Sequence, residues 1–183
     1  MENVGSADEL FLEFDSSQVP RQQRFATWAQ AMPFYECSSD VADDFHVHGS
    51  AWLKSPMFVV AAQMDEMRVI RTVEALRKDA RDDLLVRLIS EGSMEGEAEG
   101  RPFHAAAGEV VIHDLSRPLR PAFTFGGHVA AVFPAGFLEH ALPDSDLHGL
   151  VLSAPTVDLF RAFMLALPET PSWRVQRGTS LPI

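Results

Sequence analysis

Two histidines stand two residues apart, at His46 and His48, and their spacing suits metal chemistry. On a β-strand both imidazoles project to the same face, so both can reach one ion. A metal site needs a third ligand, and the candidates stand at no recognisable spacing from the pair: His104, His113, His128 and Glu95. Two interpretations therefore stay open, a metal centre in an enzyme or a polar strand face that titrates near neutral pH.

Nucleophilic and phosphate-binding chemistry find little support. No serine lies in a Gly-x-Ser-x-Gly turn. The single cysteine, Cys37, has Glu36 and Asp40 nearby, and negative neighbours disfavour a thiolate. The Gly126-Gly127 pair lacks the flanking residues of a phosphate-binding loop. We therefore expect a protein that is not an enzyme and that carries no cofactor.

Aromatic and basic residues in strand-like segments are the other candidates for a site. A small barrel lined by aromatic rings can hold one ligand, although the same rings can simply fill the interior. Arg71 and Arg87 lie in such segments. Facing outward they would be surface residues, whereas an inward-facing cation needs an acidic partner or an anionic ligand. The candidate ligand-binding residues are Phe45, Trp52, Phe58, Arg71, Arg87, Phe103, Phe123 and Phe125.

Size and charge narrow the class of protein. The chain has 183 residues, enough for about one domain. Its 15 Lys and Arg residues against 26 Asp and Glu residues leave a net charge of −11, which would repel a phosphate backbone. The longest apolar run, residues 57–64, is far too short to span a membrane, and the first residues do not form a secretory signal. We expect a cytoplasmic protein with no membrane partner.

Hydrophobic periodicity predicts a mainly β domain flanked by helices. A stripe at i, i+3, i+4 and i+7 predicts a helix over residues 21–32, and a short helix is expected at 73–78. Short alternating or apolar runs separated by turn residues favour a sandwich or barrel. We expect a partly ordered leader over residues 1–18, a helical turn at 136–141 and a tail or linker over 168–183. The strand-like runs are 45–53, 57–64, 67–72, 84–90, 94–98, 101–105, 109–113, 122–126 and 128–133.

A second amphipathic helix is predicted over residues 156–167, with Ser153 as its cap and Pro168 as its end. Its apolar stripe either packs against its own domain or pairs with a second copy of the chain in a homodimer. The candidate dimerisation residues are Val157, Phe160, Phe163, Met164 and Leu167.

The middle of the chain resembles a known family. Residues 107–118, AGEVVIHDLSRP, resemble the (P)GD-hydrophobic-D-x-x-R-P segment of the cupin-like sensor domain in AraC-type transcriptional regulators. Residues 24–28, 69–72, 82–92 and 99–101 and the Val132-Phe133-Pro134 exit occur in the matching order. The resemblance covers about residues 25–167. It implies a cupin-like (double-stranded β-helix or jelly-roll) barrel over residues 19–167 that binds a small-molecule effector and forms a homodimer.

Two departures from the family pattern matter. Metal-binding cupins carry a second histidine where this chain has Val111, which favours a metal-free barrel. AraC-type regulators continue with two helix-turn-helix units, and residues 168–183 are too short to supply one. The resemblance thus implies the sensing and dimerising half of a bacterial-type regulator, which would contact DNA only through a C-terminal domain absent from this chain. The alternatives are a metal-dependent cupin enzyme using His46 and His48, or a stand-alone cupin that binds a small molecule.

Overall fold

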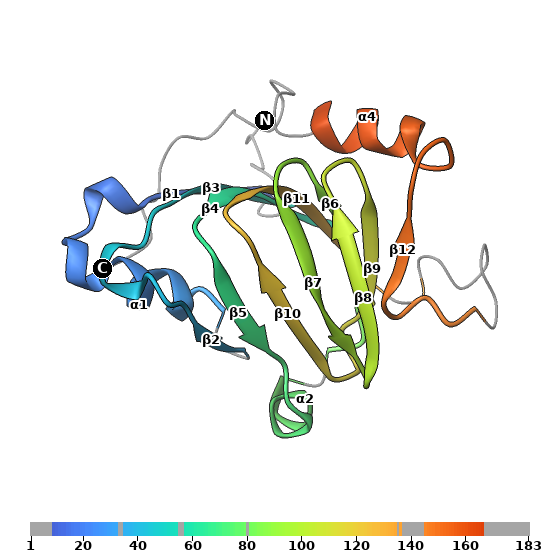
Figure 1. Ribbon diagram of the computed structural model, residues 1–183, viewed down its shortest axis with the longest axis horizontal. Helices are drawn as coiled ribbons and strands as arrows, with labels where there is room; N and C mark the ends of the chain where they lie inside the picture. Colours follow the sequence, from blue (N-terminus) through green and yellow to red (C-terminus); the bar gives the residue numbers. More distant parts are fainter. Residues whose placement is uncertain are drawn as a thin grey trace, which may run out of the picture.

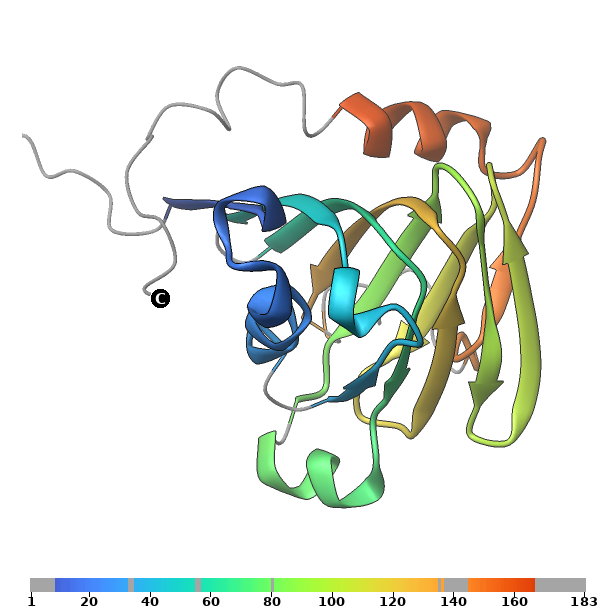
Figure 2. The same ribbon diagram turned by 60° about the vertical axis from the view of Figure 1, so that its left-hand side comes forward.

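Two antiparallel β-sheets face each other in the computed structural model, which describes residues 9–32, 35–54, 57–79, 81–134, 136 and 145–166 (Figures 1 and 2). The seven-stranded sheet has the order β1-β3-β4-β11-β6-β9-β12 and the five-stranded sheet the order β2-β5-β10-β7-β8. The mainly β, cupin-like barrel predicted from the sequence is confirmed. The strands of the larger sheet are β1 (Glu9–Asp15), β3 (Val47–Lys54), β4 (Met57–Met64), β11 (Gly126–Phe133), β6 (Leu84–Ile89), β9 (Val110–Asp114) and β12 (Leu150–Leu152). Those of the smaller sheet are β2 (Glu36–Ser38), β5 (Met67–Ile70), β10 (Leu119–Phe123), β7 (Ser93–Ala98) and β8 (Arg101–Ala106).

Alternation along each strand divides the larger sheet into an inner and an outer face. On β6, Ile89 belongs to the cluster that joins the two sheets, whereas Val86 and Leu88 belong to a separate cluster on the outer face. On β11, Val129 likewise packs on the outer side. Because side chains in a strand point alternately to opposite faces, Arg87 of β6 and His128 of β11 face the interior. The central strands β11, β6 and β9 are therefore largely buried on both faces, and most of their residues are apolar.

The helices at the N-terminal side close one edge of the interior. Helix α1 (Arg24–Gln30) follows a 3-10 turn at Arg21–Gln23. The turn and the helix together match the helix predicted at 21–32, except for its last two residues. Phe25 and Trp28 of α1 pack against the inner cluster. The short helix α2 (Val73–Asp79) confirms the helix expected at 73–78 and lies below β5 in Figure 1.

Helix α4 (Asp158–Ala166) covers the outer face of the seven-stranded sheet (Figure 2). It follows β12, which pairs with β9 at the edge of that sheet. Val157, just before the helix, is 2% exposed and Met164 is 0% exposed, and both pack with Val86 and Leu88. The helix begins at Asp158, slightly later than predicted, and Leu167, residues 137–141 and the expected tail at 168–183 lie outside the described residues.

The structure differs from the sequence prediction at β1 and β10, and the short strands β2 and β12 were not predicted. Residues 9–15, expected as part of a loose leader, form β1 and pair with β3 along their whole length, while residues 1–8 lie outside the described part. The strand expected at 122–126 is instead β10 at Leu119–Phe123, which includes Pro121. Proline is rare inside a central strand. Here it lies opposite Gly96, whose missing Cβ lets the two backbones approach closely. None of the helices in the described part is long and apolar enough to cross a membrane.

Candidate ligand-binding site

Arg71 lies inside the barrel and has an acidic partner there. Its Nη1 is 2.7 Å from Oδ2 of Asp79 at the end of α2, and the two side chains are 0% and 1% exposed. Its Nε also donates to the carbonyl oxygen of Leu115 at 2.8 Å. Burial opposes ionisation of Asp79, but the hydrogen bonds from Arg71 and from the Arg81 backbone outweigh it and lower the pKa of the carboxyl. Arg71 is thus neutralised within the fold, as the sequence requires of an inward-facing cation.

Arg87 also lies inside the barrel, on β6, and has no such partner. No carboxylate in the described part of the chain forms a hydrogen bond or ion pair with it; its Nη1 is 3.5 Å from Sδ of Met94, and its guanidinium lies 4.8 Å from the centre of the Phe123 ring. Its Nε is buried without an acceptor. The residue as a whole nevertheless has intermediate exposure, so solvent reaches part of it. Burial lowers the pKa of Arg87 to about 10, and the group stays cationic at neutral pH.

His113 and His128 flank Arg87 on the inner face. In the strand register Arg87 pairs with Val111 on β9 and with Ala130 on β11, and each histidine is two residues from that pairing position. Such diagonal neighbours lie within about 7–8 Å of each other. Both nitrogens of His113 are buried without a hydrogen-bond partner in the described structure. Burial and the nearby Arg87 charge hold the pKa of both imidazoles well below the ordinary value, so both are neutral at pH 7.

The predicted aromatic residues divide between this interior and other places. Phe103 lies 5.1 Å from the His113 ring and Phe123 lies 5.5 Å from the His128 ring, as measured between centroids. Phe58 packs on the inner side, near the start of β4. Phe45 is fully buried in the inner cluster, where its ring makes an edge contact with Phe25 of α1 at 5.2 Å.

Two of the aromatic residues predicted to bind a ligand, Trp52 and Phe125, do not lie in the interior. Trp52 packs on the outer face of the larger sheet, 5.4 Å from the Phe11 ring of β1. Helix α4 covers that face and, together with Phe11 of the neighbouring strand β1, gives the indole a core of its own. Phe125 follows β10 in a bend and is 55% exposed.

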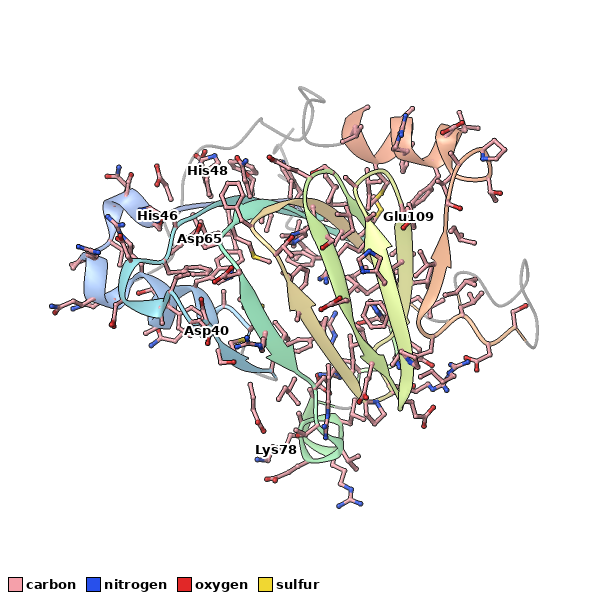
Figure 3. The ribbon with its side chains drawn as sticks, in the orientation of Figure 1. Asp40, His46, His48, Asp65, Lys78 and Glu109 are labelled. Atoms are coloured by element: carbon pink, nitrogen blue, oxygen red, sulfur yellow. The ribbon has the colours of Figure 1, made fainter. Side chains whose placement is uncertain are left out.

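The His46 and His48 pair lies at one end of the molecule, away from the interior (Figure 3). Nδ1 of His46 is 3.2 Å from Oδ2 of Asp65, and its Nε2 is 3.2 Å from Nη1 of Arg24. Both histidines are exposed, as their alternation with buried Phe45 and Val47 requires. Among the described residues no group of His, Cys, Asp or Glu side chains is arranged to hold a metal ion. The geometry therefore gives His46 a hydrogen-bonding role on the surface, between Asp65 and Arg24.

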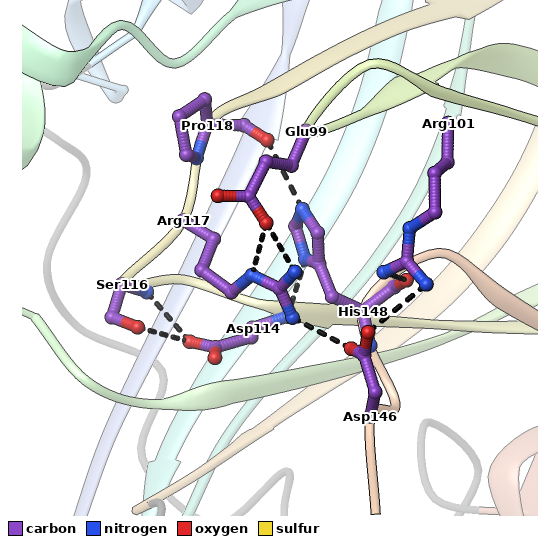
Figure 4. Close-up of polar contacts among 8 residues, drawn as sticks. All are labelled: Glu99, Arg101, Asp114, Ser116, Arg117, Pro118, Asp146 and His148. Carbon is purple, nitrogen blue, oxygen red and sulfur yellow. Dashed lines mark hydrogen bonds and ion pairs between the residues drawn. The ribbon is translucent and has the colours of Figure 1, made fainter.

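His148 connects the interior to the segment that precedes β12 (Figure 4). The residue is 2% exposed, and the centre of its ring lies 6.0 Å from the centre of the His113 ring. Nδ1 accepts a hydrogen bond from the backbone N–H of Asp114 at 3.1 Å, so Nε2 carries the proton and donates to the carbonyl oxygen of Pro118 at 3.0 Å. Burial lowers the pKa of His148, which keeps this neutral tautomer in place.

Charged residues around His148 hold the same segment against the smaller sheet (Figure 4). Asp146 accepts from Nη1 of Arg117 at 2.6 Å and forms an ion pair with Nη1 of Arg101 at 3.0 Å. These contacts lower the pKa of Asp146 to about 2. Arg117 also binds Glu99 in the turn between β7 and β8. The segment leading to β12 and α4 is thus tied to β8, to the β7–β8 turn and to the loop before β10.

The predicted dimerisation residues of α4 fall on two faces. Val157 and Met164 are part of the outer-face core, so the intramolecular interpretation holds for these two, and Phe160 packs beside them. Phe163 is 49% exposed on the other face. Leu159, which the prediction did not include, is 86% exposed on that second face, and Leu165 is 45% exposed on a separate flank of the helix.

Sequence reasoning considered His113 and His128 only as possible third metal ligands, and it missed His148 and Tyr35. Tyr35 precedes β2 and lies under the Arg71 guanidinium at 5.3 Å from the ring centre. The signal for His128 was present, because it shares the β11 face with Ala130 and Val132 in an otherwise apolar run.

Comparison with known proteins gives a structural relationship and no sequence relationship. No protein-family model matches the chain, and no curated protein does. The solved structure of the AraC-like transcriptional activator CuxR matches with a TM-score of 0.77 and 21% identity over 87% of this chain. This chain spans 60% of the length of that structure. A cupin domain of Schizosaccharomyces pombe Cnp3 matches with a TM-score of 0.39 and 10% identity, over 63% of this chain and 80% of that one. An RmlC-like cupin from Shewanella frigidimarina gives 0.38 and 15%, over 49% and 77%.

Proposed function

We propose that this chain is the effector-sensing and dimerisation domain of an AraC-like transcription regulator. The shared fold with an AraC-like activator over most of this chain, and over only 60% of that protein, supports the proposal. In such an arrangement the part of the regulator that has no counterpart here would bind DNA. The net charge of −11 agrees with this division, because phosphate contacts would belong to the other domain.

The observation that carries the proposal is the position of α4 between the barrel and solvent. One side of the helix is sealed on the outer face of the larger sheet through Met164. The other side presents Leu159 and Phe163 to solvent, at 86% and 49% exposure. Contiguous exposed apolar side chains of this kind mark interaction sites.

A second copy of the chain is the proposed partner of this exposed face. The same helix from two copies can pair about a two-fold axis, which is the commonest symmetry of soluble oligomers. Leu159 and Phe163 are four residues apart, about one helical turn, so the two side chains lie next to each other on one face of the helix. Ala162 and Ala166 beside them are small and allow two helices to approach closely.

A ligand in the interior would act on this helix through His148. The ring of His148 contacts His113 inside the barrel and is hydrogen-bonded to the backbone of Asp114 and Pro118. Its own backbone leads into β12 and from there into α4. A ligand that binds one arrangement of this segment more tightly than another shifts the population toward it. The coupling between the two sites equals the ratio of those affinities.

A fusion experiment tests dimerisation in cells. The chain is joined to a DNA-binding domain that occupies its operator only as a dimer, and repression of a reporter gene is measured. We expect the chain to support repression. The double substitution Leu159→Ser with Phe163→Ser should abolish repression and leave the purified domain folded as a monomer, because both side chains are exposed in the monomer.

The control is Leu53→Ser on β3, which removes an apolar side chain that is 43% exposed and far from α4 in the sequence. It should repress like the unmodified chain. Repression by the double variant at the unmodified level would contradict the role of the α4 face. No repression by the unmodified chain, if the fusion is folded and present at normal levels, would contradict dimerisation.

A further inference from the structure

Among the residues that the structure describes, one cation inside the barrel, Arg87, has no counter-ion. Arg71 and Arg87 both face inward, but only Arg71 has a carboxylate within contact distance, from Asp79. For Arg87 the contacts in the described structure are the Met94 sulfur and the face of Phe123. The face of the Phe123 ring attracts the cation. It does not accept the hydrogen bonds that the guanidinium N–H groups donate in their own plane. A buried charge with unmatched donors is costly, and proteins normally pair it.

Neutral polar groups lie on both sides of this cation. His113 and His128 are its diagonal neighbours on β9 and β11, and His113 is 0% exposed with both ring nitrogens unpartnered. A neutral imidazole offers one N–H donor and one acceptor. Around Arg87 the described residues therefore supply several unused donors and a single positive charge.

The chemistry of these groups selects the ligand. We propose that the barrel interior binds a small organic monoanion, a carboxylate with an apolar body, whose oxygens take the Arg87 guanidinium. This proposal rests on the effector-sensing function proposed above and names the class of effector. A guanidinium presents a planar pair of donors that matches a carboxylate in a two-bond contact.

The rest of the site fits the other features of such a ligand. The facing sheet contributes apolar surface beside Arg87, from Met94, Phe103 and Phe123, and all three are buried. His113 lies against Phe103, so its free N–H can donate to the second carboxylate oxygen or to a hydroxyl of the ligand. A dianion such as phosphate would need a second free cation, and Arg71 is already paired with Asp79. Arg87 has intermediate exposure, so solvent reaches part of the residue.

Thermal unfolding with matched pairs of acids and amides tests the proposal. The purified chain is unfolded in acetate, hexanoate or benzoate, and separately in acetamide, hexanamide or benzamide, at equal ionic strength, with inorganic phosphate as a further arm. We expect at least one carboxylate to raise the midpoint by about 5–10 °C once its concentration is near 100 times its Kd. The matching amide should produce no such shift.

Variants assign the effect to the arginine. Arg87→Met should bind the same carboxylate about 30- to 1,000-fold more weakly, because it removes one partner of a buried charged contact. Without ligand it should unfold at the same temperature as the unmodified chain or higher, since an uncompensated buried charge is gone. Arg87→Lys keeps the charge without the two-bond geometry and should bind with intermediate affinity. Arg120→Met, which removes an exposed arginine from the outer side of β10, is the matched control and should keep the full shift.

Each other outcome has a definite meaning. The proposal is overturned if no carboxylate raises the midpoint of the unmodified chain more than its amide does, or if Arg87→Met keeps the shift. It is also overturned if inorganic phosphate raises the midpoint and the carboxylates do not. If the carboxylates fail while the reporter fusion still dimerises, only the ligand class is wrong. If a carboxylate binds through Arg87 while the fusion stays monomeric, the regulatory function is wrong and the binding site stands.

Discussion

Mild acid should destabilise this protein through its two buried histidines beside Arg87. His113 and His128 have pKa values held well below the ordinary value by burial and by the Arg87 charge. The unfolded chain takes up protons on these groups below about pH 6.5, whereas the folded chain does not. The stability that they confer is therefore complete above about pH 6.5 and is lost as the pH falls toward the folded pKa.

The size of the effect follows from proton linkage. One pH unit below the unfolded pKa, each histidine that stays neutral in the folded state lowers the free energy of unfolding by about 1.4 kcal/mol. Between about pH 7.5 and about pH 5.5, His113 and His128 together should account for about 3 kcal/mol. Carboxylates add little in this window, because the folded pKa of Asp79 and of Asp146 is lowered and both titrate below it.

Urea unfolding at the two pH values, followed by tryptophan fluorescence, measures this loss. His113→Leu should reduce the pH-dependent loss by about 1.4 kcal/mol, because the proton-binding difference at His113 is removed. His104→Gln, which replaces an exposed histidine on β8, should leave it unchanged. A loss in His113→Leu equal to that of the unmodified chain would refute the assignment, because His113 would then not be neutral and buried in solution.

Two further predictions concern the framework of the barrel. Arg71→Met should cost about 3–5 kcal/mol of unfolding free energy by leaving Asp79 buried without its cation, and adding Asp79→Leu should recover a large part, as urea unfolding can measure. Equal, additive losses from the two changes would contradict the buried pair. Gly92→Ala should cost at least about 2 kcal/mol because its φ of +75° is combined with a collision between the new Cβ and the Phe125 carbonyl. Gly100→Ala, at φ +78° with open space around it, should cost only about 1 kcal/mol, and equal losses would refute the collision.

The strands of the barrel could be predicted because turn residues separate short apolar runs. The run at Met57–Met64 has the bounds that the structure shows, and those of β6, β7 and β8 differ by a residue. β1 was not predicted, since its apolar residues read as one cluster with no partner in the sequence. Its pairing with β3 depends on contacts between residues far apart in the chain.

The direction of Arg87 could not be predicted from the sequence for a physical reason. The strand Leu84–Ile89 is covered on both faces, by the interior on one side and by α4 with its neighbours on the other. Such a strand is apolar at successive positions, so no alternation tells which way the arginine points. Because α4 also covers the outer face around Trp52, that residue is buried outside the barrel, and its burial did not show which face it occupies.

The amphipathic pattern of α4 showed which residues can be buried. It did not show whether they are buried against the chain's own sheet or against a second copy. The stripe through Val157 and Met164 was correctly recognised, and the structure places it against the domain's own sheet. Leu159 was not recognised because it lies off that stripe. Only the position of the helix on the sheet shows that its 86% exposed side chain faces solvent.

The coding DNA directly after the Ile183 codon gives the most direct test of the regulatory account. The account predicts an open reading frame that continues into a basic segment with two helix-turn-helix units, which would make this barrel the part that controls DNA binding. A stop codon at that position would contradict control of an attached DNA-binding domain, and the protein would be a stand-alone cupin that binds a small molecule.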